Sequence, residues 1–96
     1  MITIEQIQKV TASYYKTRVS DILSSKRDKK NTLPRHVAMT LCKELTNNSL
    51  PTIGDMFGGR DHTTVLHANK KIINLKKEDS QLAQDMNNII HILNNG

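Results

Sequence analysis

The sequence predicts an all-α fold, a compact bundle of about six helices. Apolar residues recur at the three- and four-residue steps of helices, and no segment shows the alternation of a strand. The 96 residues include 3% aromatic residues and no Trp, so the core must be built from Ile, Leu, Val, Met and Ala. A chain of this length buries about two thirds of its unfolded surface. We therefore expect residues 1–96 to form one small domain.

The first helix is predicted over about residues 3–15. Thr3 and Gln6 have the spacing of a capping box, in which two side chains satisfy free backbone N–H groups at the start of a helix. Apolar residues then follow at helical spacing as far as Tyr14. A short second helix is expected near residues 19–24, where apolar residues again lie close together.

A polar loop and a longer helix come next. Residues 25–31 interrupt the apolar pattern and carry four basic side chains, so we expect an exposed loop there. Thr32 with Pro34 starts a helix that has apolar residues at four-residue steps and ends near residues 47–48. Cys42 is the only cysteine, which excludes an intrachain disulfide, and we expect it to be a buried thiol.

Two further helices are predicted on either side of a double glycine. Residues 50–57 make a short helix with Pro51 in its first turn, where a missing N–H costs little. Gly58 and Gly59 form the turn, and Asp61 suits the N-cap of the second helix. Two helices joined by a short Gly-containing turn, the second presenting its N-terminal residues, are a helix-turn-helix.

The second of these helices has one polar and one apolar side. At about 100° per residue, one side of this helix is polar. It consists of Arg60, Thr63, Thr64, His67, Lys70, Lys71 and Asn74. The apolar side is expected to pack on the bundle and consists of Val65, Ala68, Ile72 and Leu75. A last helix is predicted from the polar start at residues 78–80 to about Asn94.

Charge and side-chain chemistry point to a polyanionic partner. Fourteen Lys and Arg against nine Asp and Glu give a net charge of +5. Arg and Lys suit phosphate, Asp61 can accept from a cytosine amino group, and a Thr methyl can lie against a thymine methyl. No segment is apolar enough to span a bilayer or to be a signal peptide, so we expect a cytoplasmic chain.

The stretch GGRDHTTVLHA, preceded by KELTNNSLPTIGDMF, resembles the signature of the C-terminal DNA-binding domain of the DnaA family, the bacterial replication initiators. The likeness runs from about Ile4 to Leu93. It implies that a single, monomeric domain recognises short, asymmetric A·T-rich boxes in double-stranded DNA at a replication origin. It further implies a longer parent protein that binds ATP and Mg²⁺ in a preceding module and contacts acidic phospholipid.

The resemblance also implies two sets of DNA contacts. Base contacts are expected from Arg27 in the minor groove and, in the major groove, from Asp61, His62, Thr63, Thr64 and His67. Contacts with the DNA backbone are expected from Arg35, His36, Lys43, Leu50, Pro51, Arg60 and Lys71. The loop departs from the family pattern at Asp28, where members normally carry a small or basic residue.

The same residues could in principle serve other functions. His62 and His67 lie about 140° apart on a helix, whereas a helical metal pair uses the i, i+4 spacing. No nucleotide-binding loop and no Ser-His or Cys-His constellation stands out, so we expect neither catalysis nor a cofactor in this chain. The alternatives are a dimeric helix-turn-helix repressor on a palindromic operator and a protein-interaction or acidic-membrane module.

Overall fold

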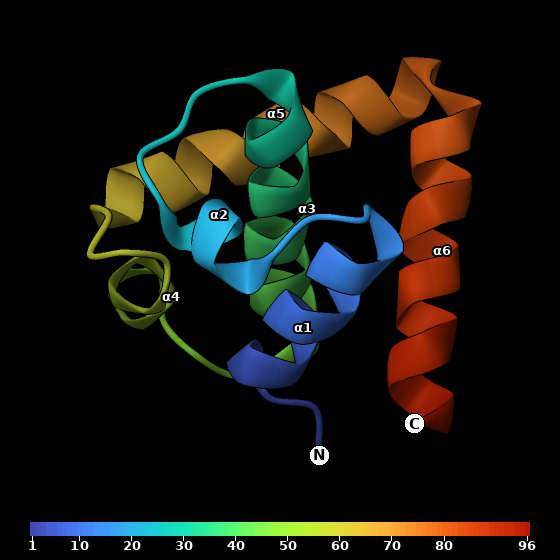
Figure 1. Ribbon diagram of the computed structural model, residues 1–96, viewed down its shortest axis with the longest axis horizontal. Helices are drawn as coiled ribbons and strands as arrows, with labels where there is room; N and C mark the ends of the chain where they lie inside the picture. Colours follow the sequence, from blue (N-terminus) through green and yellow to red (C-terminus); the bar gives the residue numbers. More distant parts are fainter.

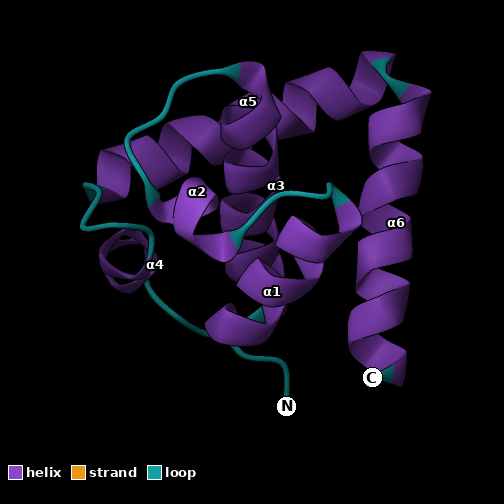
Figure 2. Cartoon of the chain, viewed as in Figure 1, coloured by secondary structure: helices purple, strands orange, loops and turns teal.

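Six helices and no strands make up the structure, a computed structural model that describes all 96 residues (Figures 1 and 2). The helices are α1 (Ile4–Tyr14), α2 (Val19–Leu23), α3 (Lys29–Leu45), α4 (Leu50–Met56), α5 (His62–Glu78) and α6 (Ser80–Asn95). They form a globule of 29 × 28 × 22 Å. The predicted all-α bundle of about six helices is confirmed.

Helix α3 is the central element, and four other helices pack directly against it. These are α1, α2, α4 and α5, whereas α6 packs on α1 and α5 at one side of the bundle (Figure 1). Every residue of α3 from Val37 to Cys42 is buried. A helix that is buried all round must be enclosed by others, and this enclosure fixes the position of α5 relative to the rest of the chain.

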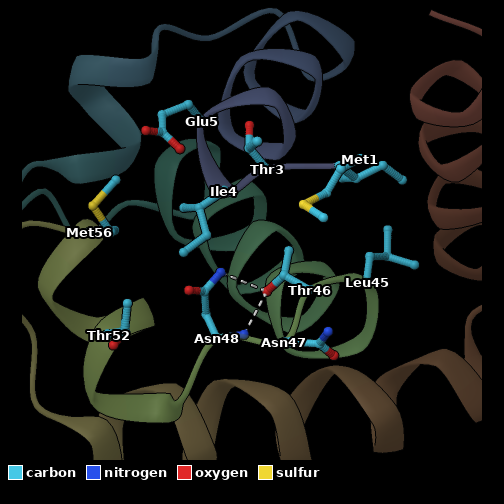
Figure 3. Close-up of a pocket in the computed structure, with 11 residues that line it drawn as sticks. Met1, Thr3, Ile4, Glu5, Leu45, Thr46, Asn47, Asn48, Thr52 and Met56 are labelled. Carbon is cyan, nitrogen blue, oxygen red and sulfur yellow. Dashed lines mark hydrogen bonds between the residues drawn. The ribbon is translucent and has the colours of Figure 1, made fainter.

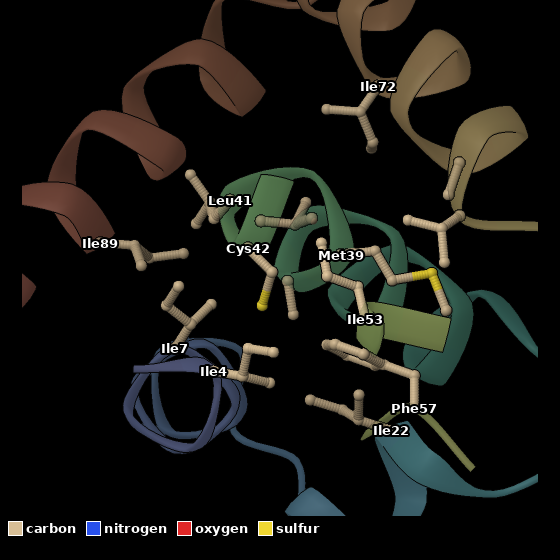
Figure 4. Close-up of a cluster of buried hydrophobic side chains, with 14 of the residues drawn as sticks. Ile4, Ile7, Ile22, Met39, Leu41, Cys42, Ile53, Phe57, Ile72 and Ile89 are labelled. Carbon is tan, nitrogen blue, oxygen red and sulfur yellow. The ribbon is translucent and has the colours of Figure 1, made fainter. Parts of the chain in front are cut away.

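The core is aliphatic, as the composition predicts. Each helix contributes a large aliphatic side chain to one buried cluster (Figure 4), namely Ile7, Ile22, Leu41, Ile53, Ile72 and Ile89. Phe57 is the one buried aromatic ring. Cys42 lies in the same cluster as a free thiol, and burial raises its pKa to about 12. The expectation of a buried thiol is confirmed.

Local sequence signals correctly predicted where most of the helices begin. The Thr3 hydroxyl accepts from the Gln6 N–H at 3.2 Å, and the Gln6 side chain accepts from the Thr3 N–H at 2.9 Å, so the capping box is present. Ser49 caps α4 and Asp79 caps α6. The bounds predicted for these helices are confirmed to within one residue at their starts.

The predicted start and end of α3 were wrong. The helix begins at Lys29, three residues before Thr32, so the exposed loop shrinks to residues 25–28. Asn31 explains the difference, because its buried side chain donates to the Asp28 carboxylate at 2.9 Å and accepts from the Thr17 hydroxyl at 3.1 Å. A polar residue held in this way has no signature in apolar periodicity. The helix ends at Leu45, before the predicted residues 47–48.

The α4–α5 turn lies against the end of α2. Gly58 has a φ of 74°, and a Cβ atom at this position would collide with the Leu23 carbonyl oxygen. Gly59 has a nearly equal φ of 73°, but a Cβ atom there would meet open space. The first glycine therefore satisfies both a backbone and a packing requirement, and the second only a backbone requirement.

This difference predicts unequal effects of two otherwise similar substitutions. Gly59→Ala should lower the free energy of unfolding by about 1 kcal/mol, the strain of a left-handed residue. Gly58→Ala should cost about 3 kcal/mol or more, because the turn must also move away from α2. Urea denaturation measures both values, and equal losses would contradict the close approach of the turn to α2.

Candidate nucleic-acid interface

The N-terminus of α5 is held by a carboxylate that is itself exposed. Asp61 is the N-cap, and its Oδ1 accepts from the Thr63 N–H at 3.1 Å. The His62 ring nitrogen Nδ1 lies 2.8 Å from the same oxygen. The hydrogen bond from the Thr63 N–H has the larger effect on the pKa of Asp61, and the nearby His62 ring has a smaller one. Both hold this pKa below its usual value, so the carboxylate is ionised near neutral pH. The capping role predicted for Asp61 is confirmed.

A row of exposed polar side chains follows this cap. The predicted base-contacting residues of the helix are all exposed, and they are Asp61, His62, Thr63, Thr64 and His67. The opposite side is buried through Val65, Ala68 and Ile72. The expected packing of Leu75 was wrong, since its side chain is 38% exposed, and the buried polar Asn69 was not anticipated. The first turns of α5 are thus held against the core on their apolar side and are exposed to solvent on their polar side.

The basic loop leads from α2 into α3 and has a single unpaired arginine. Lys26 Nζ is paired with Asp21 at 2.9 Å, so this charge is partly neutralised within the chain. Asp28, the departure from the family pattern, uses its carboxylate to bind Asn31 in the first turn of α3. Arg27 between them is exposed and has no hydrogen bond or ion pair in the structure. Its guanidinium is available to an external partner.

Arg35, predicted as a phosphate contact, points inward instead. Its side chain is 4% exposed, and its guanidinium donates to the carbonyls of Asp21, Ile22 and Ser24. Burial, and then the nearby Arg60 charge, lower its pKa from the ordinary value. This geometry leaves no face of Arg35 for a phosphate, and the structure corrects the prediction. An arginine suits a DNA phosphate and a group of backbone carbonyls alike, and only the tertiary contacts show which of the two it binds.

Arg60, also predicted to contact the DNA backbone, is half-buried in the same region. Its Nη1 donates to the Phe57 carbonyl at 2.7 Å and to the Leu23 carbonyl at 3.3 Å. Its Nη2 donates to the Ser24 carbonyl at 2.6 Å. Both terminal nitrogens are therefore engaged within the protein, and the structure does not favour the predicted backbone contact. Arg60 instead joins the α4–α5 turn to the end of α2.

His36 lies in a small cationic hollow between α3 and α5. The hollow has a volume of about 240 Å³, and its polar lining comes from Lys29, Thr32, His36, Lys71 and Asp79. Lys71 is exposed on α5, as a backbone contact requires. Neither Lys29 nor Thr32 was predicted to contact DNA, since Lys29 was expected in the exposed loop and Thr32 at the start of the helix. The earlier start of α3 brings both to the side of Lys71.

The other predicted backbone contacts lie around the α3–α4 connection. Lys43 is exposed in the last turn of α3, and Pro51 is exposed in the first turn of α4. Leu50 is half-buried and packs against the core. These side chains remain accessible at least in part, and nothing within the chain competes for the Lys43 ammonium group.

The largest hollow in the molecule does not fit a polyanion. It measures about 560 Å³ and lies between the N-terminal segment, the end of α3 and α4 (Figure 3). Glu5 is its only charged side chain, and Thr46 and Asn48 hydrogen-bond each other at its edge. No group of three or more His, Cys, Asp or Glu side chains is placed to hold a metal ion. The basic hollow beside α5 is the better candidate.

A comparison with known families bears directly on this geometry. A family model described as the bacterial dnaA protein helix-turn-helix matches residues 4–72, well over half of the 96 residues. The chain belongs to the bacterial DnaA helix-turn-helix family. Membership assigns it to DNA binding in replication initiation, through a domain that is itself non-catalytic.

The matched region of this DnaA-family domain ends within α5. It includes the turn, the exposed row of α5 and the basic loop, whereas α6 lies outside it. The matched region therefore contains the surface identified from the contacts, together with the helices that support it. None of the six helices combines the length and the apolar character needed to cross a membrane.

His36 makes the stability of this domain depend on pH. Burial, and then the charges of Lys71, Arg35 and Arg60, lower its pKa below the ordinary 6.5. The unfolded chain therefore binds more protons than the folded chain near pH 6, and the free energy of unfolding should decrease as pH falls below 6.5. His36→Gln removes this term and should show a smaller decrease between about pH 7 and pH 5.

Urea denaturation across this pH range measures the effect. His91→Gln is the matched control, because His91 is an exposed histidine on α6. The control should follow the wild type. Parallel pH dependences for His36→Gln and the wild type would show that His36 is not held in its neutral form by the fold.

Proposed function

We propose that this domain recognises short, asymmetric A·T-rich boxes of duplex DNA at a replication origin and does so as a monomer. The observation that carries the proposal is the pairing of two exposed features on one rigid frame. These are the polar row at the start of α5 and the unpaired Arg27 of the basic loop. Arg60 connects the segments that carry them. An exposed helix can enter the major groove of a duplex while an adjoining cationic arm enters the minor groove of the same duplex.

The first turns of α5 are assigned to the major groove. Asp61 has a second carboxylate oxygen beyond the one that caps the helix, and it can accept from a cytosine amino group. His62 and His67 offer ring nitrogens, and the methyl groups of Thr63 and Thr64 suit thymine. Because Val65 and Ala68 anchor the helix from behind, these side chains have little freedom to be displaced.

Arg27 is assigned to the minor groove. A·T-rich duplexes have a narrow minor groove with enhanced negative potential, which attracts an inserted arginine. The neighbouring Lys26 and Asp28 both bind partners within the chain, so Arg27 is the free cation of this loop. The Asp28 carboxylate keeps its negative charge while it accepts from the Asn31 amide, but no hydrogen bond or ion pair joins it to Arg27.

The phosphates are assigned to cations that remain exposed around these two features. Lys43 and Lys71 are the main candidates, with Lys29 joining Lys71 beside the neutral ring of His36. Leu50 and Pro51 present apolar surface to the sugars next to Lys43. Arg35 and Arg60 are left out of this set, because their guanidinium groups are used within the fold.

The proposal places residues 1–96 as the DNA-binding domain of a longer initiator. By resemblance, ATP and Mg²⁺ binding and the contact with acidic phospholipid belong to the parent protein. The isolated domain needs no partner copy, because one α5 and one loop address a single asymmetric box.

Selection of DNA from a pool of randomised duplexes tests the proposal. The enriched sequences should be A·T-rich and asymmetric, and light scattering of the complex should give one domain per duplex. Enriched palindromes bound by two copies would indicate a dimeric repressor. Equal binding to selected duplexes, scrambled duplexes and anionic vesicles would indicate a general polyanion-binding module.

Base recognition by α5 predicts a loss confined to the selected sequence. Thr63→Ala should weaken binding to the selected duplex by about 1 to 3 kcal/mol, because it removes a thymine contact. Binding to a scrambled duplex should change little. Asn87→Ala on α6 is the exposed control and should change neither affinity. Fluorescence anisotropy measures the affinity of the wild type and of both variants for each duplex. Equal weakening of Thr63→Ala on both duplexes would contradict base recognition by Thr63.

Phosphate contacts predict a steep dependence of affinity on salt. The assigned cations are Arg27, Lys29, Lys43 and Lys71, and about four neutralised charges give a slope of about −3.6 for log affinity against log salt. Lys43→Ala should make this slope shallower by about one unit and weaken all sequences alike. Lys9→Ala, which removes an exposed lysine on α1, is the matched control and should leave the slope unchanged. A slope that Lys43→Ala does not alter would remove Lys43 from the interface.

A further inference from the structure

Arg60 is placed between the two DNA-contacting features. In the sequence it directly precedes Asp61, the N-cap of α5, and in space it binds the carbonyls of Leu23 and Ser24. Ser24 is three residues before Arg27. The guanidinium therefore spans the short distance from the start of the major-groove helix to the root of the minor-groove loop.

The backbone around this bridge is fixed as well. The Arg60 N–H donates to the Gly54 carbonyl at 2.8 Å, which holds the turn against α4. Gly58 lies against the Leu23 carbonyl, so the turn and the end of α2 touch even without the side chain. Arg60 Nη1 also donates to the Phe57 carbonyl at 2.7 Å, which orients the guanidinium toward α2.

We infer that Arg60 is a positioning residue for DNA recognition, which holds the loop of Arg27 at a set place relative to the N-terminus of α5. This inference rests on the proposed function. Through Arg60 the domain reads its two grooves together: the minor-groove contact of Arg27 depends on a side chain of the helix-turn-helix turn. Arg60 contributes to sequence selection without being a phosphate ligand.

A planar fork is needed for this role. Arginine presents several N–H donors in fixed directions, whereas lysine is a point charge with one nitrogen. Arg60→Lys therefore keeps the positive charge that a phosphate contact would need and loses the simultaneous bonds to Leu23, Phe57 and Ser24. Arg60→Gln removes both. The two variants separate positioning from phosphate binding.

The experiment is a double-mutant cycle between Arg60 and Arg27, read by anisotropy on the duplex selected by the wild-type domain. Circular dichroism first identifies temperatures at which each variant is folded. Each protein is also measured on a duplex in which the A·T pairs under the loop are replaced by G·C. Lys43→Ala combined with Arg27→Ala is the control cycle, because Lys43 contacts neither the loop nor the turn.

Positioning predicts that Arg60→Lys and Arg60→Gln both weaken the selected duplex by about tenfold. Both should lose the discrimination between A·T and G·C under the loop, and both should change the salt slope only as much as Arg27→Ala does. Arg27→Ala should then have little further effect in either background, whereas the control cycle should be additive. If both Arg60 variants unfold, glycines inserted between Ser25 and Lys26 of the wild-type chain separate the loop from its anchor. The same loss of discrimination is expected there.

Two outcomes would overturn the inference while the proposed function stands. One is that Arg60→Lys keeps full affinity and discrimination, or that Arg60→Gln makes the salt slope shallower than Arg27→Ala does, as a phosphate ligand would. The other is full additivity between Arg60 and Arg27, or full discrimination in the glycine-inserted chain. A wild-type domain that binds all duplexes equally would instead overturn the proposed function, and the inference with it.

Discussion

The closure of the α2 C-terminus by two arginines is the contact on which the arrangement of this domain depends. Helix α2 has five residues, far too few to be stable alone. Of its last carbonyls, that of Asp21 accepts from the N–H and the hydroxyl of Ser24, and those of Ile22 and Leu23 need partners from outside the helix. Arg35 from α3 and Arg60 from the α4–α5 turn supply donors to the carbonyls of residues 21–24. These hydrogen bonds join the three segments, in addition to the packing of Ile22 in the core and the close approach of Gly58 to Leu23.

The same contact explains why two cations are tolerated side by side. Burial disfavours both charged guanidinium groups and lowers the pKa of each. Each arginine gains hydrogen bonds to carbonyl oxygens, and charged donors make bonds of about 1.5 to 3 kcal/mol. Both donate to the carbonyl of Ser24, the residue at which the helix gives way to the basic loop. The start of the loop at Ser24 is therefore held in place, while Arg27, three residues later, stays unpaired.

The sequence predicted much of this architecture because the decisive signals were local. The capping box at Thr3, the cap at Asp61 and the glycines of the turn each act within a few residues, and the structure confirms them. The start of α3 was wrong because Asn31 is satisfied by Thr17, a contact across the fold. The exposed polar row on α5 followed directly from helical periodicity.

The two arginines mark where prediction from residue type fails. A guanidinium matches a phosphate and a cluster of backbone carbonyls equally well, since both are arrays of oxygen acceptors. The sequence favours phosphate for Arg35 and Arg60, and only the packing of α2 against the turn shows the internal partners. Arg27 has the same chemistry and no internal partner. The distinction lies in tertiary contacts that no local pattern encodes.

The central claim is that one surface, formed by the first turns of α5 and the basic loop, contacts the DNA. Backbone amide chemical shifts of the labelled domain, recorded by NMR during titration with the selected duplex, test it most directly. The account predicts the largest changes at residues 61–67 and in the loop at residues 25–28, with α6 nearly unaffected. Changes concentrated on α6 and the Lys76–Lys77 end of α5, with residues 61–67 unmoved, would contradict it.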